Sequence, residues 1–227
     1  MKSASKLLLG ILVLLSPILL VTTSIRVALT PIFVNAEYQL PGFPEDEYGF
    51  STNDRLTWSR YAINYLLGHI THDELSNQVL PEGTPLFNER ELSHMLDVRY
   101  LTTIVLRVWY GLMIFFIIIA VIYWRSNKKI EYLNAIQQGG WLTIALILCI
   151  LIYLAINFNQ LFTRFHQIFF QGDSWLFYLS DNLIRLFPMR FWRDIFIFIG
   201  GLSILSGFVF IAAKSFLPNQ FTGKINS

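Results

Sequence analysis

Two of the four histidines stand in surroundings that suit acid–base chemistry. His94 follows Glu91 by three residues and precedes Asp97 by three, so the three side chains share one face if the segment is helical. A carboxylate one turn from an imidazole can orient the ring and raise its basicity, as a positioned general base requires. The alternative interpretation is a solvated helix end with local ion pairs. The second histidine, His166, lies in an aromatic segment, residues 165–175.

The other potentially reactive or metal-binding side chains give less evidence of a functional site. His69 and His72 have no evident partner and are interpreted as surface residues. The single cysteine, Cys149, permits no internal disulfide and no cysteine-based metal cluster. The Gly-x-Ser-x-Gly, His-Glu-x-x-His and phosphate-loop motifs are absent. Two histidines with carboxylates could hold a metal ion, but their spacing is not diagnostic, so we predict no metal site.

Several arginines lie among aromatic residues or within an apolar run. Arginines beside aromatic rings suit the level of the lipid headgroups, where they bind phosphates in a forked geometry or simply anchor the protein. These are Arg164, Arg185, Arg190 and Arg193. Arg107 lies inside an apolar run, where a charge is costly. We expect Arg107 either to pair with Asp97 or Asp194, or to extend toward the outer headgroups.

The composition identifies the class of protein that must position these residues. The chain has 227 residues, of which 54% are hydrophobic, 16% aromatic and only 14% charged, whereas an ordinary soluble domain carries about 25% charge. A chain of this composition would expose a large apolar surface to water, which excludes a soluble enzyme, a disordered tail and a disulfide scaffold. The net charge of +2 gives no support for nucleic-acid binding.

Four segments are long and apolar enough to cross a bilayer, which takes about 20 residues. They are residues 7–25, 100–124, 141–158 and 195–213, and residues 159–194 are expected to form an outer interfacial segment. The sequence therefore predicts an all-α integral membrane protein, a single membrane domain over residues 1–227 with four transmembrane helices.

The first apolar segment could instead be a signal peptide, because Val34-Asn35-Ala36 resembles a small-residue cleavage site. Arg26 and Pro31 separate that site from the apolar run, so we expect an uncleaved first helix.

The basic residues predict the orientation of the helices, because lysine and arginine favour cytoplasmic loops. With the N-terminus inside, all six lysines lie on the cytoplasmic side together with Arg125. These lysines are Lys2, Lys6, Lys128, Lys129, Lys214 and Lys224. The loop over residues 27–99 then lies outside and carries eleven acidic residues against four arginines. Both termini are therefore predicted to be cytoplasmic.

The predicted extracytoplasmic loop, residues 27–99, contains its own helix signals. Residues 53–70 show apolar residues at helical spacing, and Thr71 with Glu74 reads as a capping box opening a short helix that must stop near Pro81. We expect both helices to lie on the outer membrane surface. A third start signal has Asn88 as cap and Glu91 reaching back.

A helix running from Asn88 to Trp124 would be roughly 54 Å long, more than the hydrocarbon core of about 30 Å. Its first turns, which carry His94, must then stand above the membrane. His166 lies a few residues beyond the outer end of the third span. The topology therefore brings His94 and His166 to the same leaflet.

Three segments resemble a known family. Residues 86–98, which read Leu-Phe-Asn-Glu-Arg-Glu-Leu-Ser-His-Met-Leu-Asp-Val, are similar to a signature of the lipoprotein intramolecular transacylase (Lit) family of small integral membrane proteins. Residues 165–175 resemble its second signature, and so do residues 181–188 followed by Phe-Trp-Arg-Asp at 191–194. The four spans and the long loop between the first two fit as well.

The resemblance implies an acyl migration on bacterial lipoproteins in the plasma membrane. The substrate carries a diacylglyceryl group on the sulfur of its N-terminal cysteine. The enzyme moves the sn-2 acyl chain to the α-amine of that cysteine, giving the lyso form. No cofactor or soluble acyl donor is required, and the partners are the diacylated lipoprotein and membrane lipid. Donor and acceptor belong to one molecule, so proximity contributes directly to the rate.

Within this resemblance, His94 and His166 form the acid–base pair, facing the extracytoplasmic side, although the sequence does not say which is the base. Asp97 is the candidate to orient His94. The oxyanion requires donors, for which Asn88, Arg164 and Gln167 are candidates. The further candidates for substrate binding are Glu91, Arg107, Asp173, Trp175 and Arg185.

Three alternatives remain open at this point. A lipid or lipoprotein hydrolase would use the same histidines with water as the acceptor. A non-catalytic membrane scaffold would tolerate the loss of both histidines. Ser93 and Ser174 lie near the histidines in the chain, so an acyl-serine intermediate is also conceivable.

Overall fold

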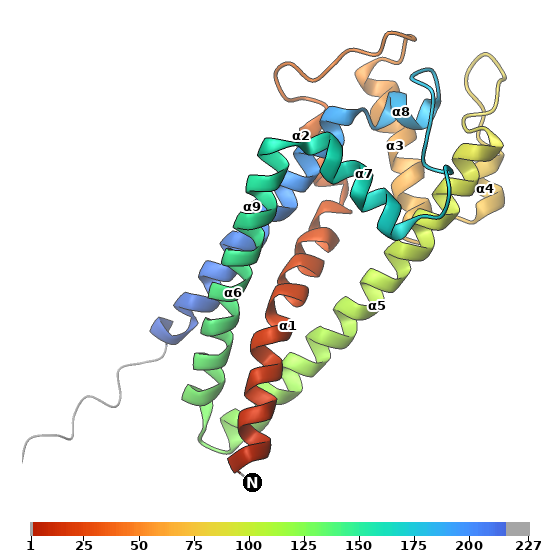
Figure 1. Cartoon of the computed structure of the whole chain (residues 1–227). Helices are drawn as coiled ribbons and strands as arrows, with labels where there is room; N and C mark the ends of the chain where they lie inside the picture. Colours follow the sequence, from red (N-terminus) through yellow and green to blue (C-terminus); the bar gives the residue numbers. More distant parts are fainter. Residues whose placement is uncertain (1, 217–227) are drawn as a thin grey trace, which may run out of the picture. The chain divides into compact units, whose positions relative to one another are not determined.

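The computed structural model describes residues 2–216, and every regular element in that range is helical apart from an isolated β-bridge between Val79 and Pro85. The helices, labelled in Figure 1, are α1 (Lys2–Ala28), α2 (Pro31–Glu37), α3 (Thr52–Leu66), α4 (His72–Ser76), α5 (Glu89–Arg125), α6 (Lys129–Ile156), α7 (Phe158–Phe169), α8 (Asn182–Leu186), α9 (Met189–Ala212) and the 3-10 helix η1 (Ala213–Phe216).

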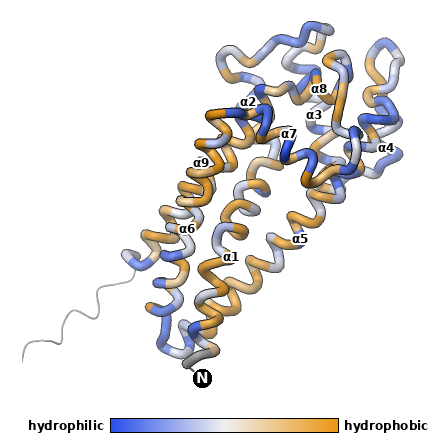
Figure 2. The backbone as a smooth tube through the Cα atoms, in the orientation of Figure 1, coloured by the Kyte–Doolittle hydropathy of each residue, from blue (hydrophilic) through white to orange (hydrophobic). Residues whose placement is uncertain are grey.

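Four of the described helices, α1, α5, α6 and α9, are long and apolar enough to cross a membrane. Figure 2 shows the apolar residues running along all four. The predicted all-α membrane fold is therefore confirmed, and the protein is a multi-pass membrane protein. Helix α5 has 37 residues and agrees to within one residue at each end with the helix considered from Asn88 to Trp124. Helix α9 begins at Met189, inside the segment expected to be interfacial. Lys224, used for the orientation, lies outside the described residues.

The chain forms two compact units. Within the described residues, the first, here the bundle unit, comprises 2–23, 109–150 and 200–216. The second, here the site unit, comprises residues 24–108 and 151–199. Both candidate histidines belong to the site unit.

Glycines permit close helix contact in the bundle unit. A Cβ atom on Gly140 of α6 would lie 2.6 Å from the carbonyl oxygen of Gly207 on α9, and one on Gly139 would collide with the Ser16 hydroxyl on α1. Small residues let helix backbones approach in this way in membranes, where burial of apolar surface does not drive helices together.

The site unit has an aromatic and aliphatic core in which α3 packs against α2, α4 and α8. Helix α3 ends at Leu66 because Gly68 adopts a left-handed conformation (φ 77°) and the N–H of His69 bonds to the carbonyl of Asn64 at 2.8 Å. This is a Schellman stop, earlier than the predicted end at residue 70.

The start of α4 matches its prediction. Thr71 and Glu74 form the expected capping box, with the Thr71 N–H bonded to Glu74 at 2.6 Å. The helix ends at Ser76, sooner than the expected stop near Pro81. It ends early because residues 78–86 form a small antiparallel turn, in which the N–H of Leu86 bonds to the carbonyl of Gln78. The helices α2, α7 and α8 were not predicted, and residues 165–169, expected in an aromatic loop, belong to α7.

Candidate active site

The two histidines singled out from the sequence lie together in the structure. His94 comes from the second turn of α5 and His166 from the last turns of α7. Their ring centroids are 6.2 Å apart and the rings are within 21° of parallel. Each residue is only 6% exposed. The fold therefore brings two imidazoles, separated by 72 positions in the chain, within reach of one small reacting group.

The hydrogen bond made by His166 determines its tautomer. Its Nδ1 lies 2.8 Å from the carbonyl oxygen of Phe162. Because a carbonyl oxygen can only accept, Nδ1 carries the hydrogen, and in the neutral ring Nε2 holds the free lone pair. Burial lowers the pKa of His166, and the bond to Phe162 opposes that shift only in part. A neutral His166 therefore has Nε2 as its basic atom.

His94 has no polar partner among residues 2–216. Its Nδ1 is buried and forms no hydrogen bond within the described chain. The edges of Phe170 and Phe177 pack against its ring, with centroid distances of 4.9 and 5.3 Å. Packing, rather than a carboxylate, fixes the orientation of this imidazole.

The structure does not bring Asp97 to His94. Asp97 is exposed, and no hydrogen bond joins it to His94 among the described residues. On a helix of 3.6 residues per turn, Glu91 and Asp97 lie about 60° to either side of His94. Glu91 is turned into the core and Asp97 to the surface, so the expected orienting role of Asp97 is not supported by the geometry.

Aromatic side chains enclose His166. Phe162, Phe165, Phe170 and Trp175 lie at centroid distances of 4.1, 5.5, 5.4 and 4.9 Å from its ring. The Trp175 indole donates to the carbonyl of Gly172 at 3.1 Å, which ties the loop after α7 against the histidine. These surroundings are apolar and suit the acyl chains of a lipid. Asp173, in the same loop, is exposed.

Glu91 is a structural carboxylate. It is 2% exposed, and its two oxygens accept from the N–H of Leu183 at 2.6 Å and of Asn88 at 2.7 Å. Asn88 in turn accepts from the N–H of Glu91 at 3.0 Å, so the predicted capping box of α5 is present. Because Glu91 is buried and both its oxygens accept from backbone groups, it joins the start of α5 to the start of α8, and the geometry does not support its expected role in substrate binding.

A second group of polar contacts joins the same segments. Asp181 accepts from the Asn88 side chain at 3.2 Å and from Arg90 at 3.0 Å, while Asn182 donates to the carbonyl of Leu86 at 2.6 Å. These contacts position Phe177 and the loop before α8 against His94. Sequence reasoning did not assign Asp181 or Asn182 a role; their only signal was their place in the third segment resembling the transacylase family.

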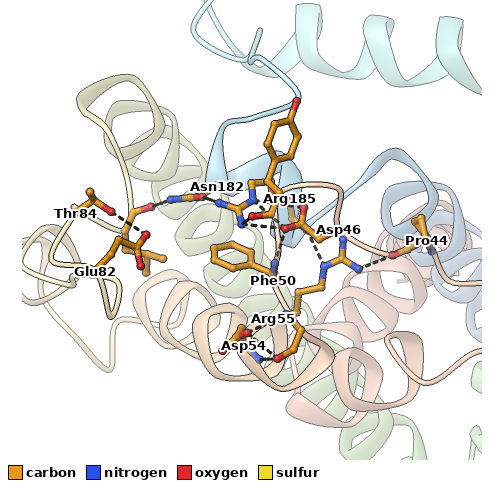
Figure 3. A network of polar contacts seen from close by, with 12 residues as sticks. Pro44, Asp46, Phe50, Asp54, Arg55, Glu82, Thr84, Asn182 and Arg185 are labelled. Atoms are coloured by element: carbon orange, nitrogen blue, oxygen red, sulfur yellow. Dashed lines mark hydrogen bonds and ion pairs between the residues drawn. The ribbon is translucent and has the colours of Figure 1, made fainter.

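Arg185 is bound within the protein. Figure 3 shows its guanidinium group between Asn182 and Asp46, and the ion pair to Asp46 measures 2.9 Å. The same group lies 3.5 Å from the ring centre of Phe50. Burial alone would raise the pKa of Asp46, but hydrogen bonds from Arg185 and from the Phe50 N–H outweigh it and lower that pKa. Arg185 therefore holds the loop after α2 in place.

The other predicted residues lie apart from the histidine pair. Arg107 is exposed on α5 and, within the described chain, forms no ion pair with Asp97 or Asp194; Asp194 pairs instead with Arg190 and Arg193. His69 and His72 make hydrogen bonds with Asn64 and Tyr65.

Arg164 and Gln167 are exposed on α7, where they line an open cavity of about 500 Å³. In residues 2–216, no three His, Cys, Asp or Glu side chains converge as metal ligands.

The chain matches a described family and a relative over most of its length. A family model described as lipoprotein intramolecular transacylase Lit matches residues 10–192. An uncharacterized protein of Aquifex aeolicus (strain VF5) is 32% identical over 220 residues, which cover 95% of this chain and 98% of that protein.

Two solved structures have the same fold. The membrane-integral lipoprotein intramolecular transacylase Lit from Bacillus cereus has a TM-score of 0.71 at 22% identity, covering 95% of this chain and 97% of that one. A variant of that enzyme with one histidine replaced by alanine has a TM-score of 0.65 at 19% identity, covering 96% and 93%.

Proposed function

The chain belongs to the lipoprotein intramolecular transacylase (Lit) family, and we propose that His94 and His166 catalyse its acyl transfer from the sn-2 position of a diacylglyceryl-cysteine lipoprotein to the α-amine of that cysteine. The observation that supports this proposal most directly is the pairing of two buried imidazoles 6.2 Å apart inside an aromatic enclosure.

The hydrogen bonds suggest how the two rings divide the work. Nε2 of His166 takes a proton from the attacking α-amine, because its Nδ1 is committed to Phe162. The amine nitrogen forms a bond to the sn-2 ester carbon, and the ester C–O bond then breaks. The proton that His166 took then passes by way of His94 to the departing glyceryl oxygen. The net change is one proton moved from nitrogen to oxygen.

The substrate supplies both reacting groups, so the protein's task is to hold them together. Intramolecular reactions in a fixed geometry reach very high effective molarities. The aromatic rings around His166 exclude water, which favours attack by the amine over hydrolysis. In the proposed orientation, both termini are cytoplasmic and the histidine pair faces the extracytoplasmic side of the bacterial plasma membrane.

Mass spectrometry of a lipoprotein's N-terminal peptide tests the proposal after co-expression with the wild type, His94→Ala or His166→Ala. The product and its precursor have the same mass, so fragmentation must locate the second acyl chain. We expect an N-acyl fragment with the wild type and its loss with both variants. His72→Ala, which replaces an exposed histidine of α4, is the matched control and should keep activity.

Other outcomes would contradict the proposal. Both chains remaining on glycerol with the wild type would refute transacylation, and loss of one chain would indicate a hydrolase. Full activity in well-expressed His94→Ala and His166→Ala would refute the catalytic role of the pair.

A further inference from the structure

Helix α7 presents two chemically different faces. Phe158, Phe162, Phe165 and Phe169 recur at helical spacing on one face. The opposite face, here called the polar face of α7, consists of Asn159, Gln160, Thr163, Arg164 and Gln167. With Asn157, these residues line the open cavity of about 500 Å³.

His166 lies at the boundary between the two faces. Phe162, four residues earlier, packs on its ring at 4.1 Å, whereas Thr163, three residues earlier, lines the cavity. A substrate positioned at His166 therefore has an aromatic surface on one side and a polar one on the other.

The polar face of α7 carries hydrogen-bonding groups with little charge. Asn and Gln side chains each offer an amide donor and a carbonyl acceptor, the same pair that a peptide unit presents. The side chains of Asn159, Gln160 and Thr163 form no hydrogen bond with any described residue, so their groups are available to a ligand. Among the described residues that line the cavity, Arg164 is the only cation, and its Nη1 lies 3.4 Å from Oε1 of Gln167.

We propose that the polar face of α7 binds the polypeptide that follows the lipidated cysteine of the substrate. The inference rests on the proposed function, because it takes the reacting cysteine to lie at His166. The peptide then leaves across Thr163 and Gln160. Side-chain amides would pair with backbone groups, so binding depends on the presence of a peptide and little on its sequence.

Kinetics with two substrates test the proposal. One is a diacylglyceryl-cysteine amide without further residues, and the other carries ten additional residues after the cysteine. For the wild type, KM is expected to be about tenfold lower for the longer substrate. The double variant Gln160→Ala with Thr163→Val should lose that difference and leave the turnover of the cysteine amide unchanged. Gln138→Ala, which replaces an exposed glutamine on α6, is the matched control and should behave as the wild type.

The outcomes separate the possible errors. Equal KM values for the two substrates with the wild type would overturn the peptide site. A rise in KM in the double variant that is equal for both substrates would also overturn it, because it would indicate a contact with the lipid. A photo-crosslinking residue at position 160 should label the peptide, and one at position 138 should not. This second measurement tests the site even if the wild type transacylated neither substrate, a result that would refute the proposed function instead.

Discussion

His166 differs from a surface histidine in its hydrogen bond as well as in its burial. The bond from Nδ1 to Phe162 fixes the tautomer and supports a positive charge on the ring, while burial disfavours that charge. Burial has the larger effect, so the pKa of His166 lies below the ordinary value of about 6.5. At neutral pH the ring is therefore an unprotonated base.

This pKa predicts the acidic loss of activity. As the pH falls, Nε2 of His166 becomes protonated and can no longer accept the amine proton. We expect kcat to fall with decreasing pH through a midpoint below pH 6.5. Protonation of the substrate amine causes a separate loss of activity, and titration of the substrate alone measures the pKa of that amine. An enzyme midpoint above pH 6.5 would contradict the proposed base.

Glu37 is a buried carboxyl group that the proposed mechanism does not use. It is 2% exposed, and its Oε1 has no hydrogen-bond partner in the described chain. Burial, followed by the neighbouring Asp194 carboxylate, raises the pKa of Glu37 from 4.5 to about 7. The folded protein thus keeps this proton between those two pH values while the unfolded chain releases it. Folding stability should therefore fall as the pH rises through this window and level off above it.

The variant Glu37→Gln tests this dependence, because it imitates the neutral carboxyl group. Its melting temperature should match the wild type near pH 4.5 and exceed it at pH 8, by an amount equivalent to roughly 1–3 kcal/mol. Thermal unfolding in detergent at both pH values measures it. The exposed Glu47→Gln is the control, and a difference between Glu37→Gln and the wild type that does not change with pH would contradict the argument.

At the scale of elements, the start of α5 is joined to the start of α8 by Glu91. Removing its carboxylate leaves the buried N–H of Leu183 without its acceptor, a cost of about 1–3 kcal/mol. We expect Glu91→Ala to lower stability by at least that amount and to lower kcat about tenfold or more, because His94 lies one turn further along the same helix. Transacylation and thermal unfolding are measured on the same sample. Glu89→Ala, in the same turn but exposed, should change neither; equal effects of the two variants would count against a positioning role.

The contact between α6 and α9 in the bundle unit depends on the absence of two side chains. Gly140→Ala would place a methyl group 2.6 Å from a backbone oxygen of α9, which cannot move aside as a side chain can. We expect a loss of about 1–3 kcal/mol in thermal unfolding experiments. Gly201→Ala on α9 has nothing within 4 Å of its new methyl group and should be neutral or slightly stabilising. A similar loss in both variants would contradict close approach of α6 and α9 as the cause.

At the scale of the whole molecule, the proposed orientation predicts which loops are accessible from outside the cell. In a Cys149→Ala background, Glu82→Cys lies in the long loop before α5 and Ser126→Cys in the loop between α5 and α6. A membrane-impermeant maleimide should label residue 82 in intact cells and residue 126 only after permeabilisation. The reverse pattern would refute cytoplasmic termini and an extracytoplasmic active site.

Local chemistry made several features predictable. The apolar spans follow from hydropathy, because no soluble fold could hide so many apolar side chains. The cap of α5 by Asn88 and Glu91 follows from their three-residue spacing. The shared level of His94 and His166 follows from span lengths and topology. Each of these depends on residues near one another in the chain or on the fixed thickness of a bilayer.

The tertiary structure decided the features that depend on which face of a helix is buried. Spacing alone treats Glu91 and Asp97 as equivalent neighbours of His94, yet packing against α8 buries only Glu91. Arg185 reached Asp46, 139 positions away, instead of remaining free for a lipid. The tautomer of His166 follows from how its ring is turned toward the carbonyl of Phe162. The residue types at these positions show what each side chain can bind, but its actual partner depends on long-range packing, which the spacing of residues along one chain does not encode.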